Sequence, residues 1–345
     1  MAYYSIIIPT NNRAQTLKAA LENLMALIPA TKQHEIIVID NASTDNTAEI
    51  CAQYPLVRYI YEQRAGLLFG RHRGAMEAQG EVLCYLDDDS FVDKEWLLGV
   101  EEGFSKDEVQ IATGPTLPFF EVEPPSWLER FWTHNKYGKT LDKLSLIDFG
   151  DKEQWIHPLF IFGCNFIIRK QALYEFGGFH PDGVPQSMLR FRGDGESGLA
   201  LHMFHYNIHA LYHPKIKIHH LVSKGRMSKE YFNKRAFAEG VSLSYTHLRH
   251  GQNHLAKIYA YIKKPIKKFL SFFGFRRDGI SCEVYKDIKK SYQEHCKQGY
   301  EFHQLEVKKN PKLLQYIKLQ NYFDLESLEA LMLDIQAKSD HNTPR

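Results

Sequence analysis

Three consecutive carboxylates, Asp87-Asp88-Asp89, directly follow the apolar run VLCYL at residues 82–86. A short apolar run of this composition is typical of a buried strand, so the acidic triplet stands at a strand terminus. Carboxylates at this spacing repel one another unless a positive charge lies among them. Mg2+ and Mn2+ prefer oxygen ligands, and such an ion can neutralise a diphosphate leaving group. The triplet therefore predicts a divalent-cation site, and a solvated acidic turn is the alternative for the triplet taken alone.

The elements that must position this triplet alternate between strands and helices. Short apolar runs predict strands, and apolar residues at helical spacing predict the helices between them. The predicted strands are residues 4–8, 35–40, 57–60 and 82–86, and the predicted helices are residues 14–28, 44–53 and 68–79. Such alternation implies βαβ units and a parallel sheet covered on both faces. Because ligands bind outside the carboxyl ends of the strands in such sheets, residues 1–115 are predicted to form a nucleotide-type domain.

The bulk composition excludes several classes of protein. The 345 residues carry 43 Lys and Arg against 41 Asp and Glu, a formal net charge of +2. This balance provides no global field for nucleic acid, which is not expected as a partner. Five cysteines without CxxC spacing indicate a reducing compartment rather than a disulfide framework. No run reaches the roughly 20 apolar residues that span a bilayer. We therefore expect a cytoplasmic protein.

Three further polar stretches accompany the triplet in order. They are Pro9-Thr10-Asn11-Asn12-Arg13 after the first strand, Asp40-Asn41-Ala42-Ser43-Thr44-Asp45 after the second, and Gly66, Arg71 and Gly74 around the helix before the fourth. Together with the triplet they resemble the family 2 glycosyltransferases, an inverting group with a GT-A fold, over about residues 4–100 and more loosely to about residue 240. The resemblance implies an α/β GT-A fold, in which a Rossmann-like parallel or mixed sheet is flanked by helices.

This resemblance also predicts how the chain is divided and which side chains bind the donor. The nucleotide-sugar-binding part is residues 1–115, the acceptor-binding and catalytic part is residues 116–225, and a C-terminal helical region is residues 226–345. The implied nucleotide-binding side chains are Pro9, Thr10, Arg13, Asp40, Arg71, Asp87 and Asp88. In the family pattern Asp40 accepts hydrogen bonds from the base, Arg71 approaches the diphosphate or closes over the base, and Asp87 faces ribose or sugar hydroxyls. Asp89 binds the metal ion, Mn2+ or Mg2+.

Three positions qualify this assignment. Asp40 opens an Asp-Asn-Ala-Ser-Thr stretch that readily forms turn hydrogen bonds, so a loop cap is its alternative role. Asn11 stands where many family members carry an aromatic residue that stacks on the base. His72 stands where the family usually has Asn.

A second cluster of polar motifs concerns the acceptor. The family carries a G-x-N strand, a G-G-F turn and an acidic pair that opens a helix; this chain has Gly163-Cys164-Asn165, Gly177-Gly178-Phe179 and Asp194-Gly195-Glu196. Inverting transfer needs a carboxylate that takes the proton of the attacking hydroxyl. Either Asp194 or Glu196 is the predicted base, with a slight preference for Glu196 from its distance to Leu199. Capping of the following helix by both residues is the alternative.

Two histidines follow the predicted strand that contains Ile216-Lys217-Ile218. Many family members place a histidine there, where it ligates the metal or contacts the diphosphate, and neutral imidazole is a reasonable ligand for Mn2+. The first of the pair, His219, aligns better and is the predicted second metal ligand, with a purely structural role as the alternative.

The C-terminal region is basic and helical in pattern. Residues 253–275 place a Phe-rich apolar stripe opposite a set of lysines, which are Lys263, Lys264, Lys267 and Lys268. A basic amphipathic helix of this kind suits an anionic membrane surface. Packing of the stripe on the enzyme body, with the lysines solvated, is the open alternative.

The sequence thus predicts a metal-dependent glycosyltransferase of the hexosyltransferase type, as used in polysaccharide biosynthesis. The expected donor is a nucleoside-diphosphate sugar, with a UDP-sugar favoured, and the expected acceptor is a hydroxyl of a glycan or lipid-linked glycan. Peripheral attachment to the inner face of the cell membrane is left open. The alternative functions are a catalytically inactive nucleotide-sugar-binding protein and a sugar nucleotidyltransferase, although the nucleotidyltransferase should carry a glycine- and basic-rich loop after the first strand. No GxGxxG follows that strand, which disfavours a dinucleotide-dependent oxidoreductase.

Overall fold

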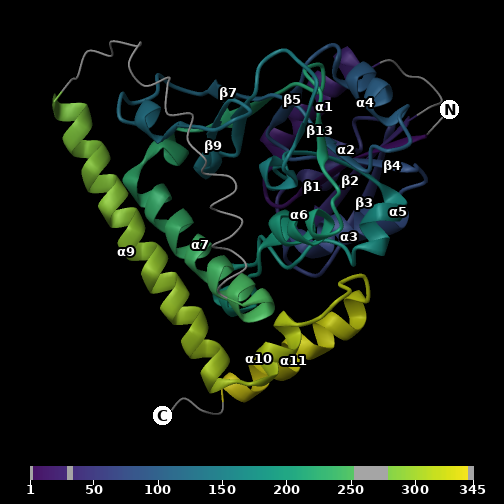
Figure 1. The fold of residues 1–345 in the computed structure, drawn as a ribbon. Helices are drawn as coiled ribbons and strands as arrows, with labels where there is room; N and C mark the ends of the chain where they lie inside the picture. Colours follow the sequence, from purple (N-terminus) through teal and green to yellow (C-terminus); the bar gives the residue numbers. More distant parts are fainter. Residues whose placement is uncertain (1–2, 29–33, 252–278, 341–345) are drawn as a thin grey trace.

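The computed structural model describes residues 3–28, 34–251 and 279–340 (Figure 1). Residues 253–275, for which membrane binding and core packing are the alternatives, therefore lie outside the described residues. None of the helices described is both long and apolar enough to cross a membrane.

The larger of two sheets has eight strands in the order β11-β13-β6-β12-β4-β1-β2-β3. Its first four strands in the chain are β1 (Tyr4–Thr10), β2 (His34–Asn41), β3 (Val57–Glu62) and β4 (Val82–Leu86), and these pair in parallel. Four later strands extend it: β6 (Ile111–Thr113), β11 (Gln154–Ile156), β12 (Asn165–Arg169) and β13 (Ala210–Tyr212). β12 runs antiparallel to β4, so the sheet is mixed.

Helices cover this sheet and bury apolar side chains against the protein core. The covering helices are α1 (Ala14–Leu27), α2 (Thr47–Cys51), α3 (Leu67–Glu77), α4 (Trp96–Phe104), α5 (Lys170–Glu175) and α6 (Gly195–His205). Gly74 lets α3 approach the sheet closely, since a Cβ at this position would lie 2.4 Å from Cγ2 of Ile7. Every residue of β1 and β4 is buried, as expected of strands covered on both faces. The predicted mixed sheet flanked by helices is confirmed.

A second sheet of six strands, in the order β5-β14-β7-β10-β9-β8, lies beside the first. Its strands are β5 (Ser90–Val92), β7 (Thr116–Phe120), β8 (Thr133–His134), β9 (Lys139–Leu141), β10 (Leu146–Asp148) and β14 (Ile218–Val222). β5 directly follows the acidic triplet and pairs with β14, which carries the two histidines. This pairing brings residues more than 120 positions apart in the sequence to one place. Short 3-10 helices, η1 (Leu128–Phe131), η2 (Asp142–Leu144), η3 (Pro158–Phe160), η4 (Gln186–Phe191) and η5 (Lys224–Met227), connect these elements.

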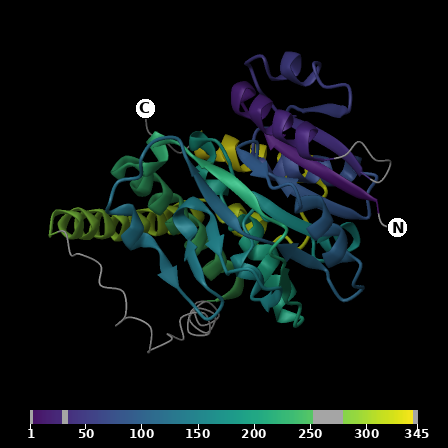
Figure 2. The ribbon, with the colours of Figure 1, turned by 90° about the horizontal axis from the view of Figure 1, so that it is seen from above.

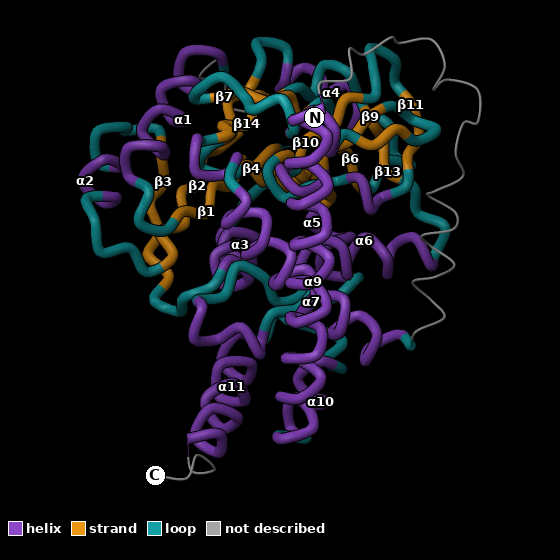
Figure 3. The backbone as a smooth tube through the Cα atoms, turned by 90° about the vertical axis from the view of Figure 1, so that its left-hand side faces the viewer, coloured by secondary structure: helices purple, strands orange, loops and turns teal. Residues whose placement is uncertain are grey.

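Four helices complete the described chain: α7 (Lys229–His250), α9 (Gly279–Lys309), α10 (Lys312–Ile317) and α11 (Leu325–Asp340). Figure 1 shows α7 and α9 side by side, and Figure 2 shows α9 extending on the side away from the N-terminus. α10 and α11 project below the sheets in Figure 3. The hydroxyl of Tyr316 on α10 donates to the carbonyl of Phe191 at 3.0 Å, which ties these helices to η4. The predicted helical C-terminal region is confirmed for its described part.

His72, which departs from the family pattern, is a core residue. It is fully buried on α3, its Nε2 accepts the backbone N–H of Phe179 at 2.9 Å, and its ring lies 4.4 Å from that of Phe323. The imidazole thus joins α3 to the Gly177-Gly178-Phe179 turn and to the segment before α11. Burial, aided by the charge of Arg71, lowers the pKa of His72 to about 3.

This burial predicts that stability falls on mild acidification. Burial also lowers the pKa of two other fully buried histidines, His157 and His303, to about 4. Because all three are less basic in the folded chain than in the unfolded one, their contribution is complete above pH 6.5 and is lost as the pH falls below it. Each unit of pH removes up to about 1.4 kcal/mol per histidine. Urea unfolding at pH 7.5 and 5.5 should therefore differ by up to about 4 kcal/mol.

The matched control for this prediction is His72→Asn, whose amide oxygen can still accept from Phe179. The variant should lose about a third of the pH dependence. Equal unfolding free energies of the wild-type protein at the two pH values would contradict the account of neutral buried histidines.

Candidate active site

The ends of β1 and β4 form one polar cluster. Thr10 donates its hydroxyl to Oδ2 of Asp88 at 2.6 Å. Arg13, at the start of α1, reaches both neighbouring carboxylates, with Nη1 2.8 Å from Oδ1 of Asp88 and Nη2 2.7 Å from Oδ2 of Asp89. Burial raises the pKa of Asp88 to about 7 against the opposing charge of Arg13. Of the predicted residues nearby, Pro9 is buried and packs against α3 at Gly70 rather than facing this cluster.

Asp40 ends β2 on the same edge of the sheet and is buried. Its Oδ1 accepts the backbone N–H of Ser43 at 2.9 Å, and its Oδ2 accepts the hydroxyl of Tyr59 at 2.7 Å. The turn hydrogen bond that the sequence raised as an alternative is therefore present. Each carboxylate oxygen retains a second lone pair, so the turn contact leaves room for a further donor. No local sequence pattern indicates Tyr59, because its strand, β3, reaches Asp40 only through the sheet pairing.

The three carboxylates of the triplet differ in solvent exposure. Asp88 and Asp89 are buried, whereas about a third (34%) of the Asp87 side chain is exposed. Asp89 is surrounded by positive or potentially positive groups: besides Arg13, Nη1 of Arg226 lies 3.4 Å from its Oδ2, and Nε2 of His220 lies 3.1 Å from its Oδ1. Although burial alone would raise the pKa of Asp89, its close contact with His220 and the charges of Arg13 and Arg226 lower it.

The structure brings His220, and not His219, to the acidic cluster. Side chains alternate along β14, so that His220 is buried beside Asp89 while His219 is half-exposed on the other side of the strand. A shift of one residue in a strand moves a side chain to the opposite face. The structure therefore places His220 at the acidic cluster, where the sequence predicted His219.

The residues around Asp89 fit a divalent cation. Nδ1 of His220 lies 3.1 Å from the carbonyl oxygen of Leu144 and donates to it, so Nε2 presents a lone pair toward Asp89 and Arg226. Oδ1 of Asp89 is buried and accepts no hydrogen bond from a described residue if this imidazole is neutral. Ligand atoms of Asp87, Cys164 and His220 also lie within 4.8 Å of one another. Carboxylates with a neutral imidazole are a reasonable donor set for Mn2+.

Arg71 connects this cluster to the second acidic motif. The side chain is buried, with Nη2 4.0 Å from Oδ1 of Asp87 and Nη1 3.1 Å from Oε2 of Glu196. The other oxygen of Glu196, Oε1, accepts the backbone N–H of Gly163 at 3.3 Å. The structure thus brings together Asp87, Arg71 and Glu196, three residues that the sequence singled out separately.

Asp194 has a different environment from Glu196. Its side chain is only 5% exposed, and its two oxygens contact Nδ1 of His180 and the hydroxyl of Thr246, each at 2.6 Å. Burial opposes ionisation of Asp194, but these contacts outweigh it and lower its pKa. Asp194 precedes the first residue of α6 without capping it through a side-chain hydrogen bond. Both of its oxygens hold neighbouring elements, whereas Glu196 is about a fifth exposed.

Gly163 is required for the position of Arg71. A Cβ at residue 163 would lie 1.8 Å from Nη2 of Arg71, too close for any real contact. We predict that Gly163→Ala displaces the guanidinium from Asp87 and Glu196 and lowers the turnover number at least about tenfold, since misplacement by about 1 Å can cost a factor of about 100. Steady-state kinetics together with thermal unfolding test this.

The control for this substitution is Gly225→Ala, since a Cβ at residue 225 meets nothing within 4 Å. It should retain wild-type turnover. Full activity of Gly163→Ala in a folded protein would show that the position of Arg71 is unimportant.

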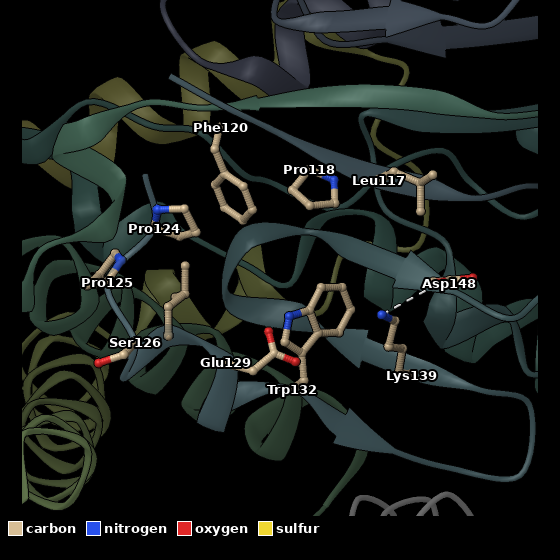
Figure 4. A pocket seen from close by; sticks show the side chains of 11 residues that line it. Leu117, Pro118, Phe120, Pro124, Pro125, Ser126, Glu129, Trp132, Lys139 and Asp148 are labelled. Carbon is tan, nitrogen blue, oxygen red and sulfur yellow. Dashed lines mark ion pairs between the residues drawn. The ribbon is translucent and has the colours of Figure 1, made fainter. Parts of the chain in front are cut away.

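A cavity of about 470 Å³ opens beside Glu196, within the size range of small-molecule sites. The catalytic candidates Asp194 and Glu196 line it together with residues of β8, η2 and α7. A smaller cavity of about 230 Å³ lies by β7, β9 and η1 and is shown in Figure 4. Trp132, Phe120 and Pro118 line it, and Lys139 pairs with Asp148 at its edge, 3.6 Å apart. None of the predicted site residues lines the smaller cavity.

Comparison with known proteins finds similarity to glycosyltransferases. The sequence model of glycosyl transferase family 2 matches residues 5–177. Glycosyltransferase AglE of Haloferax volcanii is 28% identical over 102 residues, which are 28% of this chain and 34% of that protein. Beta-monoglucosyldiacylglycerol synthase of Nostoc is 24% identical over 234 residues, which are 63% of this chain and 45% of that protein. The match thus spans less than half the length of either relative.

One solved structure resembles the chain over almost its full length. The mannosyltransferase PcManGT of Pyrobaculum calidifontis, in complex with GDP-Man and Mn2+, superposes with a TM-score of 0.53 at 14% identity and covers 98% of this chain and 86% of that one. At this identity the similarity concerns the fold alone. It confirms the predicted GT-A fold.

Proposed function

The chain belongs to glycosyl transferase family 2, and from this membership we propose that it transfers a sugar from a nucleoside-diphosphate sugar to an acceptor hydroxyl, with inversion at the anomeric carbon. The observation that carries the proposal is the position of Arg71. Its guanidinium lies between Asp87, at the carboxyl end of β4, and Glu196, which lines the larger cavity. The buried guanidinium of Arg71 thus joins Asp87, which suits the donor, to Glu196, which suits the acceptor.

The donor is proposed to lie along the carboxyl ends of β1, β2 and β4. Asp40 accepts a hydrogen bond from the base, and uracil N3–H is a suitable partner, so a UDP-sugar is the donor we favour. Asp87, the most exposed carboxylate of the triplet, faces ribose or sugar hydroxyls. Thr10 and Arg13 hold Asp88 and Asp89 in place.

Asp89 and His220 are the residues that would hold Mn2+ or Mg2+. When bound, such an ion supplies positive charge to the diphosphate and makes the nucleoside diphosphate a better leaving group. PcManGT, which shares the fold, was solved with Mn2+. Arg226 contacts both Asp89 and His220 and supplies a further positive charge near the leaving group.

Glu196 is the base we propose. Its carboxylate lines the cavity, whereas both oxygens of Asp194 are occupied by His180 and Thr246. Glu196 takes the proton of the acceptor hydroxyl as that oxygen attacks the anomeric carbon. Arg71 contacts this carboxylate at 3.1 Å and directs it toward the donor side of the cavity.

The acceptor class is proposed as a glycan or lipid-linked glycan. A relative that matches 63% of this chain is named beta-monoglucosyldiacylglycerol synthase, and this name supports a lipid-bearing acceptor. A cytoplasmic location stays a prediction from the cysteine pattern and the lack of a long apolar run, and peripheral attachment to an anionic membrane stays a prediction from residues 253–275. The family match favours neither a nucleotidyltransferase nor an inactive binding protein.

The test is a donor panel. Purified protein with Mn2+ is incubated with UDP-, GDP- and TDP-sugars, and release of nucleoside diphosphate is measured with and without EDTA. We expect metal-dependent release from at least one donor, and a UDP-sugar first. If no donor is turned over, the inactive binding protein becomes the better account.

A further inference from the structure

The cavity beside Glu196 contains an arginine that forms no hydrogen bond or ion pair with any residue that the structure describes. Arg235 lies on α7, is half-buried and lines this cavity together with Glu196. Within the described chain its guanidinium donates no hydrogen bond and has no carboxylate oxygen within the 4.0 Å ion-pair distance. Five N–H donors of a permanently charged group are thus available to whatever enters the cavity.

The other charged side chains of the described lining all have partners. Lys143 lies 3.0 Å from Asp142 and 3.2 Å from Glu239. Arg192 lies 2.7 Å from Asp182. As described above, Glu196 is paired with Arg71, and Asp194 with His180. Arg235 is the exception.

The neighbours of Arg235 do not compensate it by contact. Asp182 and Glu239 act on its charge from a distance, but their oxygens are directed to Arg192, to Lys143 and to the hydroxyl of Tyr292. A cavity that ends on a spare guanidinium favours a ligand with a planar or tetrahedral anionic group, because Arg binds carboxylate and phosphate through paired N–H donors.

We propose that the acceptor is anionic and that Arg235 binds its carboxylate or phosphate group while Glu196 faces its hydroxyl. The inference rests on the proposed function in one respect, namely that the acceptor enters this cavity. Arg235 is then a determinant of acceptor specificity. It takes no part in donor binding, since the donor groups lie across Arg71 from the cavity.

Direct binding tests the proposal without requiring turnover. The full chain with Mn2+ is titrated by calorimetry with three probes: methyl β-glucuronide, inorganic phosphate and the neutral methyl β-glucoside. The test variant is Arg235→Gln. The control variant is Lys234→Gln, which removes one positive charge from the exposed neighbouring side chain of α7. Arg235→Lys keeps the charge and serves if Arg235→Gln fails to fold.

At least one anionic probe should bind the wild-type protein more tightly than the glucoside. Its affinity should fall at least about tenfold in Arg235→Gln, the loss expected for a charged hydrogen bond, and should be unchanged in Lys234→Gln. Tighter binding of the glucuronide indicates a sugar acid, and tighter binding of phosphate indicates a phosphorylated or lipid-phosphate acceptor.

The proposal is overturned if neither anionic probe exceeds the glucoside, or if Arg235→Gln and Lys234→Gln weaken binding equally. It is also overturned if every anionic probe that binds more tightly than the glucoside binds Arg235→Gln as it binds the wild-type protein, as phosphate held at the donor site would. Failure of the donor panel would instead contradict the proposed function, and the calorimetric result would still decide the charge preference of the cavity.

Discussion

Asp89→Asn is expected to reduce metal-dependent release of nucleoside diphosphate at least about a thousandfold, because metal stabilisation of leaving-group charge contributes several kcal/mol. The amide keeps the shape of the side chain but removes the negative charge on which Arg13, Arg226 and His220 converge. Mn2+ affinity, measured by electron paramagnetic resonance of the free ion, should fall together with activity.

Stability must be measured alongside, because Asp89 is buried among charged partners. Removal of one partner of a buried charge network costs about 3–5 kcal/mol, so the melting temperature should also fall. The control is Asp93→Asn, a nearby carboxylate that pairs with Lys217 at 3.2 Å and is not part of the cluster. Wild-type Mn2+ affinity in a folded Asp89→Asn protein would rule out Asp89 as a ligand.

Glu196→Gln is the second substitution with a large expected effect. Loss of a general base should lower the turnover number by about 10²- to 10⁴-fold, with the KM for the donor nearly unchanged. The single amide oxygen can accept either from Arg71 or from the backbone N–H of Gly163, so one of the two hydrogen bonds is lost and thermal unfolding must be measured alongside. Steady-state kinetics with the donor found in the panel provide the measurement.

Asp194→Asn distinguishes the two candidates. Because Asp194 bonds to His180 and Thr246 in the interior, its substitution should reduce stability more than turnover measured on the folded fraction. Glu102→Gln, a surface carboxylate paired with Lys215, should change neither. The base would have to be reassigned to Asp194 if Asp194→Asn abolished turnover in a stable protein while Glu196→Gln did not.

Local pattern was sufficient to predict the parallel half of the sheet. Residues 82–86 were predicted as a strand and form β4 with those bounds, and the helix predicted at residues 14–28 is α1, Ala14–Leu27. The pattern of apolar residues within each of these segments identifies it as a strand or a helix, and polar residues follow the end of each strand. The strand-end cluster of Thr10, Asp88 and Asp89 follows directly from parallel pairing of β1 with β4.

Other features depend on tertiary contacts that no local pattern contains. The position of His220 depends on which face of β14 its side chain occupies. β5, the strand that pairs with β14 at the acidic cluster, lies more than 120 residues away in the sequence. Tyr59 reaches Asp40 across two paired strands, and Arg71 meets Glu196 across 125 residues. The alternation along β14 was a signal that could have separated His219 from His220, since the apolar Ile218 and Val222 share a face with His220.

The choice between Asp194 and Glu196 likewise required side-chain directions. Both residues stand at the start of α6, where either can point inward or toward the cavity. Partners on other elements decide the matter: His180 and Thr246 bind Asp194, while Arg71 and Gly163 hold Glu196 at the cavity.

The stereochemistry of the product tests the central claim most directly. An α-configured nucleotide sugar from the panel is turned over in the presence of Mn2+, and the anomeric configuration of the first-formed product is read by proton nuclear magnetic resonance before mutarotation. A single attack assisted by Glu196 predicts a β-configured product, formed only while the divalent ion is present. An α-configured first product, or product formed at the same rate in excess EDTA, would contradict the proposed mechanism.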